Sequence, residues 1–300
     1  MLAAGVASAQ VATIFELTGT ATTAMATAAG APPAAARSLR KGDGVNQGES
    51  VTTGAASNIV LRFLDGQVVA LAANSTFTIN NYTYNVANPA QSNVLLSLVN
   101  GGMRAITGLI GKARPQAVSY RVGNATIGVR GTDVSFAIRS GNIVVNVELG
   151  LVTYVYPGRP NVTIQVGQGA FQTAGGKLTT GNPKAIANAI AAAMVENKDD
   201  SNIVSVLSQM AGALIAVTGN ADLKKEITTS VQGTGIHNAA QWTSGAARLM
   251  TNLLGNLGQT GTTTTTVTGT TGSGGGGTLP LCSTIVSPTA PRPGVNCRTS

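Results

Sequence analysis

The sequence predicts a mainly β domain, either a β-sandwich or a short β-solenoid, followed by a small α-helical region and a low-complexity tail. Three observations support this fold class. Up to about residue 175, short runs of alternating apolar and polar residues are separated by Gly, Asn and Asp turn signals. After residue 181 the apolar spacing changes to that of a helix. From residue 258 onward, Thr and Gly dominate the composition.

The first nine residues are small and apolar and end in Ala7-Ser8-Ala9. This pattern is typical of the last part of a secretory signal peptide that is cleaved before Gln10. The stretch lacks the basic start and the full apolar core of such a peptide. We therefore interpret residues 1–9 as a signal peptide remnant and expect the protein to be exported. An ordinary N-terminal segment is the alternative.

The predicted β-domain covers residues 10–175. Residues 11–20 have the composition of a first strand, whereas the Ala/Thr/Pro-rich residues 22–36 are expected to form an exposed loop. Asp65-Gly66 between two apolar runs is a strong signal for a tight hairpin. Further strands are predicted at residues 59–63, 76–84, 152–156 and 162–166.

A second hairpin is predicted over residues 134–149. Its first strand alternates apolar with smaller or polar residues, and residues 140–142 read Ser-Gly-Asn, which favours a turn. The return strand should place Val145, Val147 and Leu149 on the core side and Asn146 and Glu148 on the other.

The helical region is predicted over residues 182–257. Asn182 is a good N-cap and Pro183 fits the first helical position. A second helix should begin near Asp200 and end at Gly219. None of the helices reaches the roughly 18 apolar residues needed to span a bilayer, so no transmembrane span is predicted. Two further helices are expected at residues 222–231 and 237–257.

Composition argues against several classes of partner. Only 10% of the residues are charged, against roughly a quarter in ordinary globular domains. The net charge of +8 comes from scattered basic residues without interleaved aromatic residues, so a nucleic-acid surface is not predicted. Aromatic residues make up 4% of the chain and offer few of the platforms that glycan-binding proteins use.

No catalytic, cofactor-binding or metal site is predicted. His237 is the only histidine, and no neighbouring group is indicated as its partner in acid–base chemistry. One histidine with two distant cysteines cannot supply the roughly four ligands of a zinc site. Asp43, Asp65 and Asp133 could in principle gather around calcium, but each also lies where Asp favours a turn. We therefore expect a protein that is not an enzyme.

Residues 125–134 read Ala-Thr-Ile-Gly-Val-Arg-Gly-Thr-Asp-Val, with glycines close enough together to suggest a turning backbone. This segment resembles the igVRGTdf signature of FecR-type domains, named for the regulator of bacterial iron-dicitrate uptake. Upstream, residues 39–54, 60–71 and 94–104 resemble a repeat, a hairpin and a strand of that family in the same order. Together the resemblance covers roughly residues 11–172.

The resemblance implies a FecR-like, extracytoplasmic all-β domain without catalysis. Fully regulatory members of the family also carry a cytoplasmic anti-sigma segment and one membrane helix, and we expect this chain to lack both. The family-motif residues are assigned a structural role, and they are Gly128, Val129, Arg130, Gly131, Thr132 and Asp133.

Two interpretations of Arg130 and Asp133 remain open. The favoured one is a buried charged pair that pins a crossover between strands, because buried charges must be paired. The alternative is that Arg130 recognises a carboxylate of a partner protein.

Residues 258–300 are expected to form a Thr/Gly-rich linker and a Cys-bounded C-terminal segment. The chain's only cysteines, Cys282 and Cys297, lie close together in sequence. In an exported protein such a pair favours a disulfide, and two free thiols are the alternative.

These features support the hypothesis of a non-catalytic exported FecR-domain protein that acts as a protein-binding or structural scaffold at the cell envelope or surface. The alternative is a periplasmic signal-transducing regulator of the FecR type. Self-association is also expected, because the helices carry apolar stripes and the candidate edge strands carry few charges.

Overall fold

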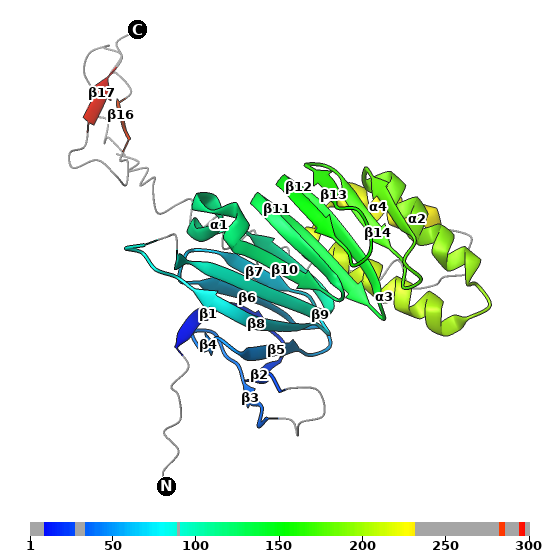
Figure 1. The fold of residues 1–300 in the computed structure, drawn as a ribbon, viewed down its shortest axis with the longest axis horizontal. Coiled ribbons are helices and arrows are strands. Elements are labelled where there is room, and N and C mark those ends of the chain that lie inside the picture. Colours follow the sequence, from blue (N-terminus) through cyan, green and yellow to red (C-terminus); the bar gives the residue numbers. More distant parts are fainter. Residues whose placement is uncertain (1–8, 28–33, 89–90, 232–281, 286–293, 298–300) are drawn as a thin grey trace, which may run out of the picture. The chain divides into compact units, whose positions relative to one another are not determined.

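The computed structural model describes residues 9–27, 34–88, 91–231, 282–285 and 294–297. The chain forms two compact units, residues 1–250 and 251–300. Figure 1 shows the elements of the first unit. In chain order, the strands of its sheet come before a group of three helices within the described residues.

The strands of the first unit are β1 (Gln10–Thr18), β2 (Ala21–Met25), β3 (Arg37–Ser38), β4 (Gly44–Asn46), β5 (Glu49–Thr53), β6 (Asn58–Phe63), β7 (Val68–Leu71), β8 (Thr76–Thr83), β9 (Asn93–Ile106), β10 (Val118–Val122), β11 (Ala125–Arg139), β12 (Asn142–Val155), β13 (Val162–Gln165), β14 (Gly169–Gln172) and β15 (Leu178–Gly181). The helices are α1 (Leu109–Ala113), the short 3-10 helix η2 (Pro115–Ala117), α2 (Pro183–Glu196), α3 (Ser201–Thr218) and α4 (Ala221–Val231).

The strands pair into one large mixed sheet that folds into two facing layers. We call layer A the strands β4, β1, β6, β7, β14 and β15, and layer B the strands β3, β2, β5, β8, β10 and β13. The long strands β9, β11 and β12 pair with layer B at one end and with layer A at the other. Aromatic pairs join the layers: Phe63 lies 5.2 Å from Tyr82, and Tyr120 lies 5.4 Å from Phe136, between ring centroids. The predicted mainly β fold is confirmed, as a sandwich whose layers share strands.

Glycines mark the places where the long strands change layer. Gly101 in β9, Gly131 in β11 and Gly150 in β12 have φ angles of +91°, +55° and +81°. Side-chain-bearing residues rarely adopt this left-handed region, so glycine is the residue that permits each corner. The expectation that the motif glycines mark turning backbone is met at Gly131.

Two details of the β-domain differ from the prediction. The predicted loop at residues 22–36 is wrong at its start, because β2 lies there and pairs with β5, and the buried Thr23 hydroxyl donates to Ser50 O at 3.2 Å. Leu149 was expected to face the core but is 62% exposed. The cause is an irregular register just before the Gly150 corner: Val147 pairs with Val134 and Leu149 with Asp133, so Glu148 is an extra residue that reverses the alternation.

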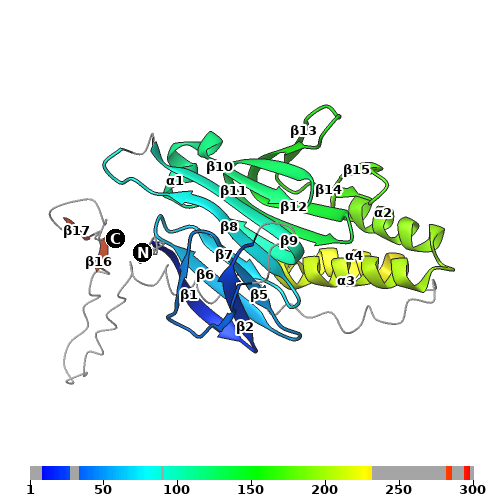
Figure 2. The ribbon, with the colours of Figure 1, turned by 60° about the horizontal axis from the view of Figure 1, so that its bottom comes forward.

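Helices α2 and α3 cover the outer face of layer A, and α4 packs on them. Figure 2 shows these three helices gathered at the β12 and β14 end of the sheet. The predicted N-caps are present: Asn182 Oδ1 accepts from Ala185 N at 2.9 Å, and Asp200 Oδ1 accepts from Asn202 N at 2.9 Å. The helix predicted at 237–257 lies outside the described residues. A second hydrophobic core joins the helices to the sheet, and its members include Ala137, Val144, Phe171, Ile190, Leu207, Met210, Leu214 and Ile227.

Helix α3 has the length and the apolar composition to cross a membrane, which the sequence analysis expected of no helix. It is the one such helix among the residues that the structure describes. Half of its residues are buried within the protein, and its apolar side packs on β9, β11 and β12. A helix that packs one side in a protein core needs apolar residues there, so this packing is sufficient to explain the hydrophobicity of α3.

The second unit contains a two-stranded sheet of β16 (Cys282–Ile285) and β17 (Gly294–Cys297). Cys282 and Cys297 are directly opposite in its antiparallel register. Opposite residues in such a pair have Cα separations of about 4.5–5.5 Å, within the range that a disulfide bridges. The disulfide itself stays a prediction. The signal peptide remnant, apart from Ala9, and His237 lie outside the described residues.

Candidate functional site

The family motif forms the corner at which β11 passes from layer B to layer A. The pairing of β11 with β12 shifts between Arg130 and Asp133, and Gly131 occupies the shift. Across the corner, a Cβ on Gly150 would lie 2.6 Å from the carbonyl oxygens of both Arg130 and Gly131. The two backbones therefore meet so closely that β12 has no room for a side chain at this point.

Thr132 fixes the corner to the end of β9. Its backbone N–H donates to Thr107 Oγ1 at 2.9 Å, and its carbonyl accepts from both the backbone N and the hydroxyl of Thr107 at 2.9 Å. Both threonines are buried. These bonds satisfy backbone groups that the irregular register leaves without a ladder partner.

Asp133 is paired with Arg104, so the prediction that Arg130 is its partner is wrong. Arg104 Nε donates to one carboxylate oxygen at 2.7 Å and its terminal nitrogen donates to the other at 2.6 Å. Arg104 also donates to Thr218 O at the end of α3, at 3.2 Å. The reason is register: Arg104 lies opposite Ser135, diagonally adjacent to Asp133, whereas the corner turns Arg130 to the outside of layer B.

Glu148 lies beside this ion pair in a half-buried position. Its Oε1 accepts from Ser135 Oγ at 3.1 Å and from Asn146 Nδ2 at 2.9 Å, while its Oε2 has no partner. Burial raises the pKa of Glu148 to about 7, against the opposing effects of Asn146, Arg104 and Ser135 and with the help of the Asp133 charge. The face expected to be the solvent side of the hairpin is thus partly an internal polar cluster.

We expect Glu148→Gln to flatten the pH dependence of stability. The folded pKa of about 7 lies above the ordinary 4.5, so unfolding between these values releases a proton and stability falls as pH rises. The amide removes this penalty while still accepting through its oxygen. At pH 8 the variant should gain at most about 3 kcal/mol in unfolding free energy, and below pH 4.5 the gain should vanish.

Urea unfolding at pH 4.5 and pH 8 measures this difference. Glu196→Gln is the control, because that carboxylate is 60% exposed and pairs only with Lys177 at 3.6 Å. If wild type and Glu148→Gln have parallel pH profiles, Glu148 does not carry the predicted cost.

The three aspartates considered for calcium do not gather. Asp65 is buried and accepts from Tyr82 Oη at 2.8 Å, from Gln67 N at 3.1 Å and from Ile110 N, at the start of α1, at 3.2 Å. Asp43 accepts from Arg40 N at 2.7 Å. Within the described residues, no group of three or more His, Cys, Asp or Glu could hold a metal ion.

Arg130 is exposed, and its side chain has no hydrogen bond or ion pair with any residue that the structure describes. Arg130 lies opposite Leu151 in β12, and Leu151 lies opposite Gln165 in β13. Leu149 is two residues before Leu151, and Val166 directly follows Gln165, so their backbones lie at the same corner. Their exposed fractions are 58% for Val166 and 62% for Leu149. We call Arg130, Leu149 and Val166 the corner surface. It combines an unpaired cation with two exposed apolar side chains.

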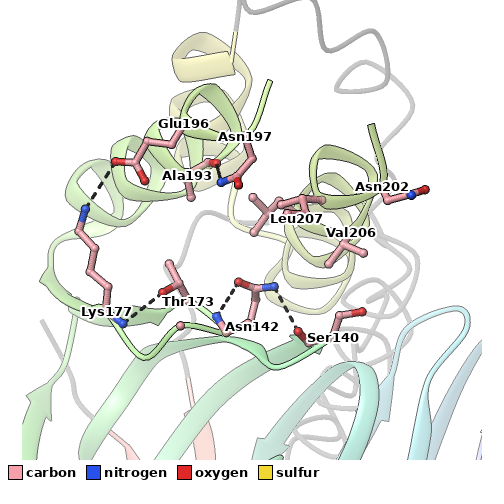
Figure 3. Close-up of a pocket in the computed structure, with 13 residues that line it drawn as sticks. Ser140, Asn142, Thr173, Lys177, Ala193, Glu196, Asn197, Asn202, Val206 and Leu207 are labelled. Carbon is pink, nitrogen blue, oxygen red and sulfur yellow. Dashed lines mark hydrogen bonds and ion pairs between the residues drawn. The ribbon is translucent and has the colours of Figure 1, made fainter. Parts of the chain in front are cut away.

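Figure 3 shows a separate cleft of about 360 Å³ between the turn after β11 and the helices α2 and α3. Leu207 and Val206 form part of its wall, and Lys177 and Glu196 stand on its rim. The amide of Asn142 is already bonded to backbone groups of the adjacent turns. The cleft therefore offers mainly an apolar wall with few free polar groups.

Residues 49–153 match the FecR protein family model. The FecR match begins at β5 and ends within β12, so it contains Arg104, the Gly131 corner and Glu148. It is shorter than the resemblance noted at residues 11–172, which also takes in β1, β2, β13 and β14.

No curated protein matched the chain. Two crystal structures of a "putative anti-sigma factor" from Parabacteroides distasonis align with 44% of this chain and 59% of theirs, at 15% identity and TM-scores of 0.36 and 0.37. TM-scores this low do not establish a common fold.

The sequence analysis named the residues of the corner but misassigned one role. It missed Arg104 as the partner of Asp133, although Arg104 ends a segment that it had matched to the family. It also missed Leu149 and Val166 as exposed residues. The signal that could have found them is the pair Leu149-Gly150, since a glycine in mid-strand often marks a bend.

Proposed function

We propose that this protein is a non-catalytic FecR-domain module of the cell envelope that binds a partner protein through the corner surface. The FecR match supports a regulatory or binding role and an association with the envelope. The observation that carries the proposal is the exposed, unpaired Arg130 inside the family motif, at a corner of the backbone that also carries the exposed Leu149 and Val166.

The chemistry of the corner surface suits a partner segment with a carboxylate and an apolar residue. A guanidinium presents a planar fork that matches a carboxylate, and arginine is enriched among residues that dominate binding energy. The charge of the surroundings acts in the same direction: residues 107–181 contain seven Lys or Arg and two acidic residues, Asp133 and Glu148. Both acids are largely buried in the internal cluster, so the field outside is positive.

Site-specific photo-cross-linking in the native host tests this proposal. A photoreactive residue at Leu149 should give one discrete cross-linked species, and adding Arg130→Glu should abolish it. Thr52 in β5 is the control position. It is exposed, and the strands β8, β9 and β10 separate β5 from β11 within layer B. Equal cross-linking from Thr52, or no effect of Arg130→Glu, would place the contact elsewhere.

The mass of the cross-linked species separates two kinds of partner. A product of twice 30.0 kDa that contains only this chain would indicate self-association, and a larger or smaller product would indicate another protein. Self-association has lost one of its two supports. The apolar stripes of α2 and α3 are packed in the protein's own second core rather than exposed.

A further inference from the structure

A small hollow lies at the end of layer B, away from the corner surface. It is lined by Arg121, Gly123, Asn124, Tyr156 and Pro157 and has a volume of about 290 Å³. Two neighbouring connections form it. One is the tight turn between β10 and β11, and the other is the chain that leaves β12 toward β13.

The pairing of the strands holds these residues in place. Arg121 lies opposite Thr126, and Thr126 lies opposite Val155, the residue before Tyr156. Adjacent strands lie about 4.8 Å apart, so Arg121 and the start of the β12–β13 connection are separated by one intervening strand. Gly123 has a φ of +57°, which makes the turn tight. The hollow is therefore built on paired strands rather than on a long loop.

The lining side chains leave their binding groups free. Arg121 and Asn124 are exposed, and neither side chain has a hydrogen bond or ion pair with another described residue. Tyr156 packs one side of its ring on the main core and remains partly accessible. No carboxylate lines the hollow. The arrangement is a cation, an amide and an aromatic ring with a proline around one concave space.

We infer that this hollow binds an acidic sugar, such as a uronic acid residue of an anionic polysaccharide. The Arg121 guanidinium matches the fork geometry of a carboxylate. The Asn124 amide has both donors and an acceptor, which suits neighbouring ring hydroxyls. The electron-rich faces of aromatic rings attract the weakly positive C–H groups on the flat side of a pyranose, and Tyr156 supplies such a face. A few polar groups around an apolar wall are typical of small-ligand sites.

An aspartate or glutamate side chain of a protein would satisfy Arg121 alone. It would leave the Asn124 amide and the Tyr156 ring without a role, because it lacks vicinal hydroxyls and a flat apolar face. The low aromatic content of the chain argued against glycan binding in the sequence analysis. A single sugar unit, however, needs only one aromatic ring, and here a cation lies beside it.

Isothermal titration with methyl glucuronide and with neutral methyl glucoside tests the inference on the whole chain. The acidic sugar should bind saturably, and the neutral sugar should bind at least about tenfold more weakly for want of the charge-assisted contact. Arg121→Ala should lower affinity for the acidic sugar by about tenfold or more. Tyr156→Leu, which keeps apolar packing on the core but removes the ring, should lower affinity for both sugars.

Arg62→Ala is the matched control, because it removes another exposed arginine, in β6, that lies outside the hollow. It should leave sugar binding unchanged, and circular dichroism should show that all variants are folded. Equal affinity for both sugars, no saturable binding, or equal losses in Arg121→Ala and Arg62→Ala would overturn the inference. The last result would mean that only the net positive charge attracts the ligand.

Discussion

Arg104→Ala is expected to destabilise the β-sandwich by about 3 kcal/mol, because it leaves the Asp133 carboxylate largely buried without its partner. The two side chains are only 14% and 15% exposed and share two short hydrogen bonds. The substitution also removes the bond to Thr218 O that ties the end of α3 to the sheet. Urea unfolding at pH 7 measures the loss as a lower midpoint.

Arg130→Ala is the matched control for this prediction. It deletes the same kind of side chain, but at an exposed position without a partner, so its effect should stay within about 0.5 kcal/mol. The double variant Arg104→Ala, Asp133→Ala should recover part of the stability that the single variant loses, since no unpaired charge remains. Equal midpoints for Arg104→Ala and wild type would show that the pair is not the anchor described above.

Gly150→Ala is expected to be at least as damaging, with a loss of roughly 3 kcal/mol or more. A left-handed φ alone costs an alanine about 1–2 kcal/mol, and Gly150 has a φ of +81°. In addition, the new Cβ would lie 2.6 Å from two carbonyl oxygens of β11. Neither backbone can retreat without breaking the register on both sides of the corner, so strain is added to the conformational cost.

Gly158→Ala separates the two causes. Gly158 has a φ of +75° but nothing within 4 Å of its Cβ position, so only the conformational cost applies. Thermal unfolding should show a small fall in Tm for Gly158→Ala and a much larger one for Gly150→Ala. Equal falls would mean that the close approach of β11 and β12 contributes nothing to stability.

Local patterns in the sequence predicted the elements of the fold well. Asn182, Asp200 and Gly219 delimit their helices as expected, because caps act on backbone groups within three residues of themselves. Val134 and Phe136 are fully buried as their alternation predicts, but Ser135 and Ala137 between them are fully buried too, because α3 packs on the other face of β11. The caps and the alternation require no knowledge of distant parts of the chain.

The site could be predicted only in part, because its interactions depend on distant residues. Asp133 and Arg104 are 29 positions apart, and their pairing follows from a register that no local pattern encodes. Asn146 and Glu148 look like the solvent face of a hairpin, but α3, which begins more than 50 residues later in the chain, packs on β12. Arg130 and Asp133 are close in sequence, but one irregular glycine corner sends their side chains to different surfaces.

The strands β9, β11 and β12 each run through both layers of the sandwich. An ordinary sandwich can part along the plane between its sheets, and one half can then exist briefly without the other. Here three covalent crossings bridge that plane, so separation would require the crossings themselves to straighten. We expect the sandwich to resist being pulled or peeled apart and to melt as one cooperative body.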